Sequence, residues 1–228
     1  MKIAIDGPGG AGKSYLARNL AQKLGLKYVD TGALYRTIGL AAARRGIKMD
    51  DTAGIVAMLP DVDISLDYKD GRQCVFLSGE DVSDAIRTPE ISLYASAVSA
   101  IPEVREFLFD LQRTLAAKGD VVMDGRDIGT VIMPDADVKI FLYASIEDRA
   151  KRRFDELTRK GMSVTYEEVL ADMKKRDSQD SGRKIAPAIP AEDAVLLDNS
   201  SFADPADTFA AAIRIINEKT GASYDDVL

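Results

Sequence analysis

The sequence predicts an α/β fold in which a five-stranded parallel sheet carries helices on both faces. Short apolar runs rich in β-branched residues alternate with stretches of helical periodicity, as in parallel strands joined by crossover helices. A glycine-rich turn follows the first run and leads into a helical stretch. Two further segments interrupt the alternation, so we expect an insertion and a charged helical segment in addition to the sheet.

Five apolar runs are expected to form the strands of this sheet. They read KIAI, LKYV, DVVMD, VKIFLYA and AVLLD, at residues 2–5, 26–29, 120–124, 138–144 and 194–198. Runs of this length bounded by polar residues are typical of buried strands. A chain of 228 residues suggests one domain, or one domain with insertions, built on such a sheet.

The first and last helices have clear boundaries in the sequence. The first is expected at roughly 13–24, where leucines recur every four residues and Gly25 supplies a stop. The last is expected over Asp204–Lys219, with Asp204 as its N-cap and Pro205 at the first helical position. The side chains expected to face the core from this helix are Phe209, Ile213 and Ile216.

Two segments depart from the alternation of strands and helices. Residues 63–80 alternate apolar and polar side chains around Asp70-Gly71, which predicts a small antiparallel hairpin, followed by helices up to about residue 118. Residues 147–184 are rich in charges of both signs and lack the apolar content of a core element. They predict either a solvated helical pair or a mobile flap that binds anions.

Composition excludes several classes of protein. The 37 acidic residues outnumber the 30 basic ones, and the net charge of −7 argues against a nucleic-acid partner bound through a broad basic surface. The single cysteine, Cys74, excludes an internal disulfide, and neither a spanning segment nor a signal peptide is visible. We therefore expect a cytoplasmic protein with no membrane partner. The absence of histidine excludes Ser-His-Asp hydrolysis and most zinc chemistry.

The glycine-rich turn matches a phosphate-binding pattern. In DGPGGAGKSYL, Gly7, Gly12, Lys13 and Ser14 fit G-x-x-x-x-G-K-[ST] between a strand and a helix. Glycines let successive backbone N–H groups point at an anion, and the helix start adds its positive end. Lys13 would bridge β and γ phosphates, while the hydroxyl of Ser14 suits Mg2+. The alternative is a glycine-rich turn without a ligand.

Two more strand ends carry polar residues. The carboxyl ends of parallel strands open at one edge of the sheet, so these residues should lie near the phosphate loop. The second strand leads into DTGALYR and the third into DGRDIGT. Asp30 or Thr31 taken alone is equally well explained as a helix N-cap. Arg36 and Arg126 together indicate a second phosphate-bearing ligand, because guanidinium groups match phosphate oxygens bidentately.

Five motifs of the chain occur together in one family of enzymes. The phosphate loop, DTGALYR, DGRDIGT, RDSQDSGRKIAP and LLDNSS have the order and spacing found in bacterial cytidylate kinases, which the chain resembles over essentially its whole length. These are P-loop nucleoside monophosphate kinases. The resemblance implies a P-loop core at 1–62, 119–146 and 185–228, a monophosphate-binding insertion at 63–118, and a lid at 147–184. It also implies transfer of the γ-phosphoryl group of ATP to CMP or dCMP with Mg2+.

The resemblance implies a role for each matched position. The expected ATP-binding residues are Gly7, Pro8, Gly9, Gly10, Ala11, Gly12, Lys13, Ser14, Tyr15, Arg149 and Arg153. The expected acceptor residues are Thr31, Arg36, Arg126 and Arg183 for the CMP phosphate, Ser96, Arg105 and Asp127 for cytosine, and Arg176 and Asp180 for the sugar. The expected catalytic residues are Lys13, Arg126 and Arg176, and the expected metal ligands are Ser14 and Asp124.

Some roles keep an alternative explanation. Asp124 is also a candidate for an N-cap or a loop anchor, and any lid arginine is also a candidate for a surface ion pair only. Phosphoryl transfer needs no covalent intermediate, so alignment and charge stabilisation would fall to Lys13, Mg2+ and the arginines.

Other functions remain open at this point. A different small-acceptor P-loop kinase, for shikimate or dephospho-coenzyme A, shares the loop and the lid but not the insertion in this form. A regulatory GTPase normally needs an N-K-x-D segment, and the chain contains no Asn-Lys pair. A nucleic-acid-binding ATPase is disfavoured by the acidic composition. We expect a monomer.

Overall fold

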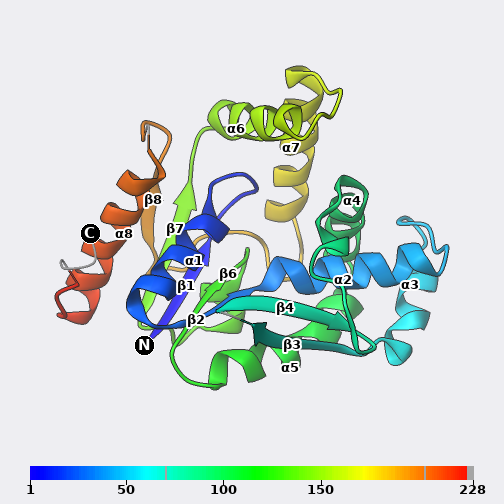
Figure 1. Ribbon diagram of the computed structural model, residues 1–228, viewed down its shortest axis with the longest axis horizontal. Helices are drawn as coiled ribbons and strands as arrows, with labels where there is room; N and C mark the ends of the chain where they lie inside the picture. The colour runs from blue at the N-terminus through cyan, green and yellow to red at the C-terminus, as the bar shows by residue number, and fades with distance from the viewer. Residues whose placement is uncertain (70, 203, 225–228) are drawn as a thin grey trace. The chain divides into compact units, whose positions relative to one another are not determined.

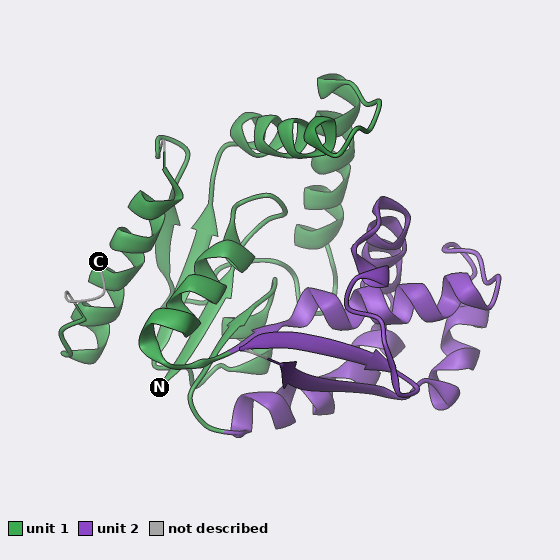
Figure 2. Cartoon of the chain, in the orientation of Figure 1, with its two compact units in different colours: residues 1–27, 119–228 green, residues 28–118 purple. Residues whose placement is uncertain are grey.

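The computed structural model describes residues 1–69, 71–202 and 204–224 (Figure 1). The chain divides into two compact units. Unit 1 consists of residues 1–27 and 119–228, and unit 2 consists of residues 28–118 (Figure 2). Unit 1 contains the phosphate loop and the charged segment. Unit 2 contains the antiparallel hairpin and the whole segment expected to be an insertion, residues 63–118.

The five apolar runs form one parallel sheet, as predicted. Its order is β2-β6-β1-β7-β8, and the strands are β1 Lys2–Asp6, β2 Lys27–Asp30, β6 Val121–Asp124, β7 Val138–Tyr143 and β8 Val195–Asp198. The central strand β1 pairs in parallel with β6 and β7, so that Ile3 lies opposite Val122 and Val138. β6 is buried along its whole length, which explains why it reads as an unbroken apolar run.

Two helices of unit 1 confirm the boundaries expected from the sequence. Helix α1 spans Lys13–Leu24 and ends at Gly25, whose left-handed backbone forms the C-cap. Helix α8 spans Pro205–Thr220, and its N-cap Asp204 accepts a hydrogen bond from the backbone N–H of Ala206 at 2.8 Å. The apolar stripe of α8 includes Ile213 and Ile216, which are fully buried.

The charged segment forms a helical pair. Helix α6 spans Ile146–Arg159 directly after β7, and α7 spans Tyr166–Ser181 (Figure 1). A capping box formed by Thr165 and Glu168 begins α7. Phe154 and Tyr166 pack edge to face across the pair, with ring centroids 6.4 Å apart.

Unit 2 contains the predicted hairpin. Strands β3 Ile64–Lys69 and β4 Arg72–Leu77 pair antiparallel, with Ile64 opposite Leu77. Asp70 of the expected turn lies outside the described residues. A third strand, β5 Glu80–Asp81, pairs with β4 and was not predicted, because two residues are too short to give a periodic signal.

Four helices and the hairpin enclose a separate hydrophobic core in unit 2. The helices are α2 Thr31–Arg44, α3 Thr52–Met58, α4 Pro89–Val98 and α5 Pro102–Ala117. Its core includes the fully buried side chains of Leu34, Ile38, Ile55, Ile86 and Leu108. Within the ranges that the structure describes, no helix is both long and apolar enough to cross a membrane.

Candidate active site

The phosphate loop connects β1 to α1 and depends on Gly7 for its path. A Cβ atom at Gly7 would lie 1.9 Å from the carbonyl oxygen of Leu142 on β7, and the φ angle of Gly7 is +142°. Only glycine satisfies both conditions. No side chain caps the start of α1 at Gly12, which is the arrangement found where an anion takes that place.

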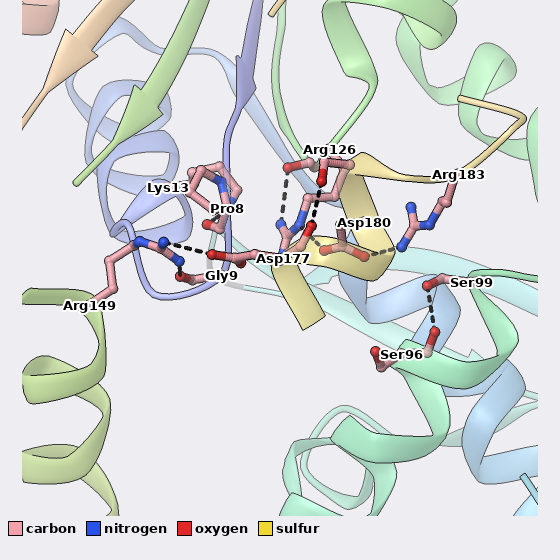
Figure 3. Close-up of polar contacts among 12 residues, drawn as sticks. Pro8, Gly9, Lys13, Ser96, Ser99, Arg126, Arg149, Asp177, Asp180 and Arg183 are labelled. Atoms are coloured by element: carbon pink, nitrogen blue, oxygen red, sulfur yellow. Dashed lines mark hydrogen bonds and ion pairs between the residues drawn. The ribbon is translucent and has the colours of Figure 1, made fainter. Parts of the chain in front are cut away.

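Lys13 is buried beside the loop, and its Nζ donates to the carbonyl oxygen of Pro8 at 2.8 Å (Figure 3). Burial lowers the pKa of Lys13 well below its usual value, and the nearby positive charge of Arg126 adds to this effect. Asp124 and Asp6 act in the opposite direction. A phosphate in the loop would place further negative charge next to Lys13 and stabilise its charged form, so the site favours an anionic ligand.

Two side chains with oxygen atoms that could hold a hard cation lie together near the start of α1. The hydroxyl of Ser14 donates to Oδ2 of Asp124, the last residue of β6, at 2.8 Å. Asp124 is buried and is not the residue that caps the following π-helical turn, Ile128–Ile132, whose N-cap position is Asp127. Among the described residues, no three acidic, cysteine or histidine side chains are grouped as metal ligands. A metal at Ser14 and Asp124 would therefore need water and phosphate oxygens to complete its shell.

Arg126 links the turn after β6 to helix α7. Its Nε donates to Oδ2 of Asp180 at 3.0 Å, and its Nη1 donates to the carbonyl oxygen of Gly125 at 3.1 Å (Figure 3). A Cβ atom at Gly9 would lie 3.6 Å from Nη2 of Arg126, so the guanidinium group is next to the phosphate loop.

The carboxylate of Asp180 interacts with three arginines. It pairs with Arg126 and with Arg183, and Arg176 lies one turn before it on α7. Burial opposes ionisation of Asp180, but the three guanidinium groups outweigh it and hold the pKa of the carboxyl below its usual value. Helix α7 ends at Ser181 with Gly182 as C-cap, so Arg183 reaches Asp180 from beyond the helix rather than from a continuous helical face.

Arg149 is a buried connection between α6, the phosphate loop and α7. Its guanidinium group donates to the carbonyl oxygens of Ala144 at 3.0 Å and Gly9 at 2.9 Å, and to Oδ2 of Asp177 at 2.7 Å. Asp177 was not among the residues that the sequence singled out. A Cβ atom at Gly10 would lie 3.0 Å from Cε of Met173, so α7 packs directly on the loop.

The remaining ATP-binding candidates differ in their surroundings. The carbonyl oxygen of Ala11 accepts a hydrogen bond from Nδ2 of Asn199, in the LLDNSS motif, at 3.0 Å. Tyr15 is 54% exposed on α1. Arg153 pairs with Glu156 on α6 at 2.7 Å, which is the surface ion pair that the sequence offered as an alternative.

Asp6 is a second residue that sequence reasoning did not select. It is the last residue of β1 and is 5% exposed. Its carboxylate accepts hydrogen bonds from the backbone N–H groups of Ile128 and Gly129 at 2.8 and 2.7 Å. Burial raises the pKa of Asp6 to about 6 although both hydrogen bonds lower it.

In unit 2, the DTGALYR motif forms the start of α2. Asp30 is the N-cap, accepting from the N–H of Ala33 at 3.0 Å and pairing with Arg87 at 2.8 Å. Burial acts against ionisation of Asp30, but Arg87 and Arg36 outweigh it and lower its pKa. Thr31 is the first residue of α2, so of the two candidates for the N-cap, Asp30 fills that position.

Ser96 and Arg105 lie on α4 and α5 of unit 2. The carbonyl oxygen of Ser96 accepts from the hydroxyl of Ser99 at 2.9 Å, and that of Ser99 accepts from Nη1 of Arg105 at 3.2 Å. The guanidinium carbon of Arg105 lies 5.6 Å from the ring centre of Tyr35. Arg105 is only 9% exposed, which is unusual for arginine outside a binding site or a buried ion pair.

Comparison with known proteins identifies close relatives. Residues 3–217 match the model of the family described as cytidylate kinase. A cytidylate kinase from Caldanaerobacter subterraneus subsp. tengcongensis is 54% identical over 204 residues, which cover 90% of this chain and 89% of that protein. One from Caldicellulosiruptor bescii is 52% identical over 202 residues, 89% of each chain. A crystal structure of an uncharacterized protein from Eubacterium ventriosum shares the fold, with a TM-score of 0.50 at 15% identity, covering 97% of this chain and 99% of that one.

Proposed function

The chain belongs to the cytidylate kinase family, and we infer from this that it transfers the γ-phosphoryl group of ATP to CMP or dCMP, giving ADP and CDP or dCDP. The observation that carries the proposal is the convergence of Lys13, Arg126 and Arg176 beside the phosphate loop of unit 1. Burial is the main cause that lowers the pKa of Lys13, and the charges of Arg126 and Arg176 lower it further, so the three positive groups lie close enough to repel one another. Positive groups placed in this way suit a transferring phosphoryl group, which carries negative charge.

The donor nucleotide is assigned to the loop. Backbone N–H groups at the start of α1 and the ammonium group of Lys13 would contact the β and γ phosphates of ATP. The carbonyl oxygen of Pro8, which now accepts from Lys13, would give way to a phosphate oxygen. Arg149 would act by holding Gly9 and α7 in place, because its guanidinium group is already bonded to protein atoms.

Magnesium is assigned to Ser14 and Asp124. Their oxygens are 2.8 Å apart and are hard donors of the kind that Mg2+ prefers. Mg2+ bound to the nucleotide phosphates would neutralise charge that develops during transfer. Ser14 would contact the ion through its hydroxyl, and the carboxylate of Asp124 would hold the ion directly or through water.

For each unit taken by itself, the family resemblance assigns residues to the acceptor. In unit 2 these are Thr31, Arg36, Ser96 and Arg105, and in unit 1 they are Arg126, Asp127, Arg176, Asp180 and Arg183. Charge supports this assignment in unit 1, where three arginines surround Asp180. In unit 2 it is supported by the buried guanidinium group of Arg105 against Tyr35.

A coupled ADP-release assay tests the proposal. CMP and dCMP should be used with kcat/KM well above those for UMP, AMP and shikimate. Lys13→Ala should remove most turnover, because it deletes the charge aimed at the transferring group, while circular dichroism shows an intact fold. Preference for shikimate would favour the small-acceptor alternative. Nucleotide hydrolysis without any acceptor would favour a switch protein.

A further inference from the structure

Asp6 makes hydrogen bonds just beyond the point where the backbones of β1 and β6 stop pairing. Its side chain thereby extends the contact between the two strands. β1 and β6 pair up to Ile5 and Asp124, and the N–H of Gly125 still donates to the carbonyl oxygen of Ile5 at 3.0 Å. One residue later the two backbones no longer pair. There the carboxylate of Asp6 takes over and accepts two backbone N–H groups from the turn after β6.

The two backbone amides that Asp6 binds directly follow Arg126 and Asp127 in the turn after β6. Oδ1 accepts from Ile128 at 2.8 Å and Oδ2 from Gly129 at 2.7 Å, so both carboxylate oxygens are used. Arg126 and Asp127 immediately precede these amides. Holding Ile128 and Gly129 therefore fixes the end of the short segment that carries both side chains.

The turn approaches Asp6 and Lys139 closely at Gly129. A Cβ atom at Gly129 would lie 3.4 Å from Oδ2 of Asp6 and 3.2 Å from Cδ of Lys139 on β7. Contacts this close leave little room for a side chain. A Cβ atom at this position would require the side chain of Lys139, or the turn itself, to shift by a small amount.

Keeping a carboxylate at this place is unfavourable for the fold alone. Asp6 is 5% exposed, and burying a charge costs free energy that hydrogen bonds only partly recover. Burial raises the pKa of Asp6, Asp127 raises it further, and Lys13 opposes them. A neutral side chain would avoid this cost but would lose the double acceptor.

We propose that Asp6 is a positioning residue for acceptor binding: it holds the turn after β6 so that Arg126 and Asp127 are placed to contact the acceptor nucleotide. What Arg126 and Asp127 contact rests on the proposed function, whereas the hold on the turn does not. Asp6 itself touches neither substrate in this account. Its effect should therefore appear in acceptor binding more than in donor binding.

Asp6→Asn tests the proposal. The amide has one acceptor, so its NH2 group must face one of the two backbone N–H donors, and one hydrogen bond is lost. Hydrogen exchange at Ile128 and Gly129 should become at least about tenfold faster. KM for CMP should rise about tenfold and the preference for CMP over UMP should narrow. KM for ATP should stay within about threefold, since removing a negative charge near Lys13 does not repel an anionic donor.

Two further variants control the experiment. Gly129→Ala changes the contact between Asp6 and the turn without changing the charge, and it should also raise the KM for CMP. It therefore tests the proposal even if Asp6→Asn does not fold. Ile216→Val, in the core under α8, should cost a similar amount of stability, about 1 kcal/mol, and leave base preference unchanged.

The proposal would be overturned if hydrogen exchange at Ile128 and Gly129 were unchanged in Asp6→Asn. It would also be overturned if the KM values for CMP and ATP changed equally in both Asp6→Asn and Gly129→Ala. A wild-type enzyme that does not prefer CMP would instead overturn the proposed function, and the exchange measurement would still decide whether Asp6 holds the turn.

Discussion

Arg149 and Asp177 form an ion pair that joins helix α7 to the phosphate loop. Nη2 of Arg149 lies 2.7 Å from Oδ2 of Asp177, while Nη1 of the same guanidinium group donates to the carbonyl oxygen of Gly9 (Figure 3). Arg149 is 4% exposed. Because the buried side chain of Arg149 bonds to both Asp177 and Gly9, a movement of α7 should displace the phosphate loop. Loss of the Asp177 carboxylate would leave the buried charge of Arg149 without this partner.

We therefore expect Asp177→Asn to loosen α7 and to slow turnover. The neutral amide keeps the size of the side chain but loses the charge, which should cost about 1–3 kcal/mol, and kcat should fall about tenfold. Kinetics and hydrogen exchange along α7 measure the two effects. Asp155→Asn is the matched control, since Asp155 forms an exposed pair with Lys151 on α6 that should contribute little. Equal behaviour of the two variants would contradict the expectation.

A second prediction concerns magnesium. If Asp124 and Ser14 hold the ion with the nucleotide, Asp124→Asn should raise the Mg2+ concentration needed for half-maximal rate several-fold, and Ser14→Ala should act in the same direction. Rates measured across a Mg2+ series at constant free ATP test this. Asp120→Asn serves as control, because Asp120 is exposed and pairs with the amino terminus. An unchanged Mg2+ requirement in both Asp124→Asn and Ser14→Ala would remove these residues from the metal site.

The sheet could be predicted because its strands are buried. Strand β6 reads as an apolar run since each of its side chains is enclosed, and α1 carries both an apolar stripe and a glycine stop. These patterns depend only on neighbouring residues, so they can be recognised in the sequence without knowledge of the tertiary structure. β5 gave no signal because its two exposed residues have no period.

The supporting residues of the site could not be predicted in the same way. Asp177 looks like a charge on a solvated helix, and only the fold brings it to Arg149. Asp180 was expected near the sugar from the family resemblance, but its ion pair with Arg126 needed the structure. Asp6 had a usable signal, because it ends β1 at the edge where parallel strands place polar residues. The partners of its carboxylate lie more than a hundred residues away, so its role needed the structure.

A third prediction follows from the buried carboxyl of Asp6. Its pKa is raised from 3.8 to about 6, so between these values the native state holds more protons on Asp6 than the unfolded chain does. The contribution of Asp6 to the free energy of unfolding therefore falls as the pH rises through this window, by at most about 3 kcal/mol. The difference in unfolding free energy between wild type and Asp6→Asn, measured from pH 4 to pH 7, should show that slope. A difference independent of pH would mean that Asp6 titrates normally.

The last prediction concerns the choice of base, and it follows from hydrogen-bond polarity. Cytosine presents a donor at its 4-amino group and an acceptor at N3, whereas uracil presents an acceptor at O4 and a donor at N3. An ionised Asp127 can only accept, which suits the 4-amino group, and Arg105 can only donate, which suits N3, so each side chain taken by itself favours cytosine. Both are buried, at 5% and 9% exposure, and a mismatched buried polar group is costly.

A mismatch with uracil should cost on the order of 2–4 kcal/mol, which is roughly a 30- to 1000-fold preference in kcat/KM for CMP over UMP. Asp127→Asn, whose amide can turn to donate, should lower the use of CMP and narrow that preference, while the affinity for ATP stays nearly unchanged. Steady-state kinetics with both acceptors and a separate ATP titration measure these effects. Should the variant keep the full preference, Asp127 does not read the base; its role would then be to tether the turn that directs Arg126, from its buried position just before Ile128–Ile132.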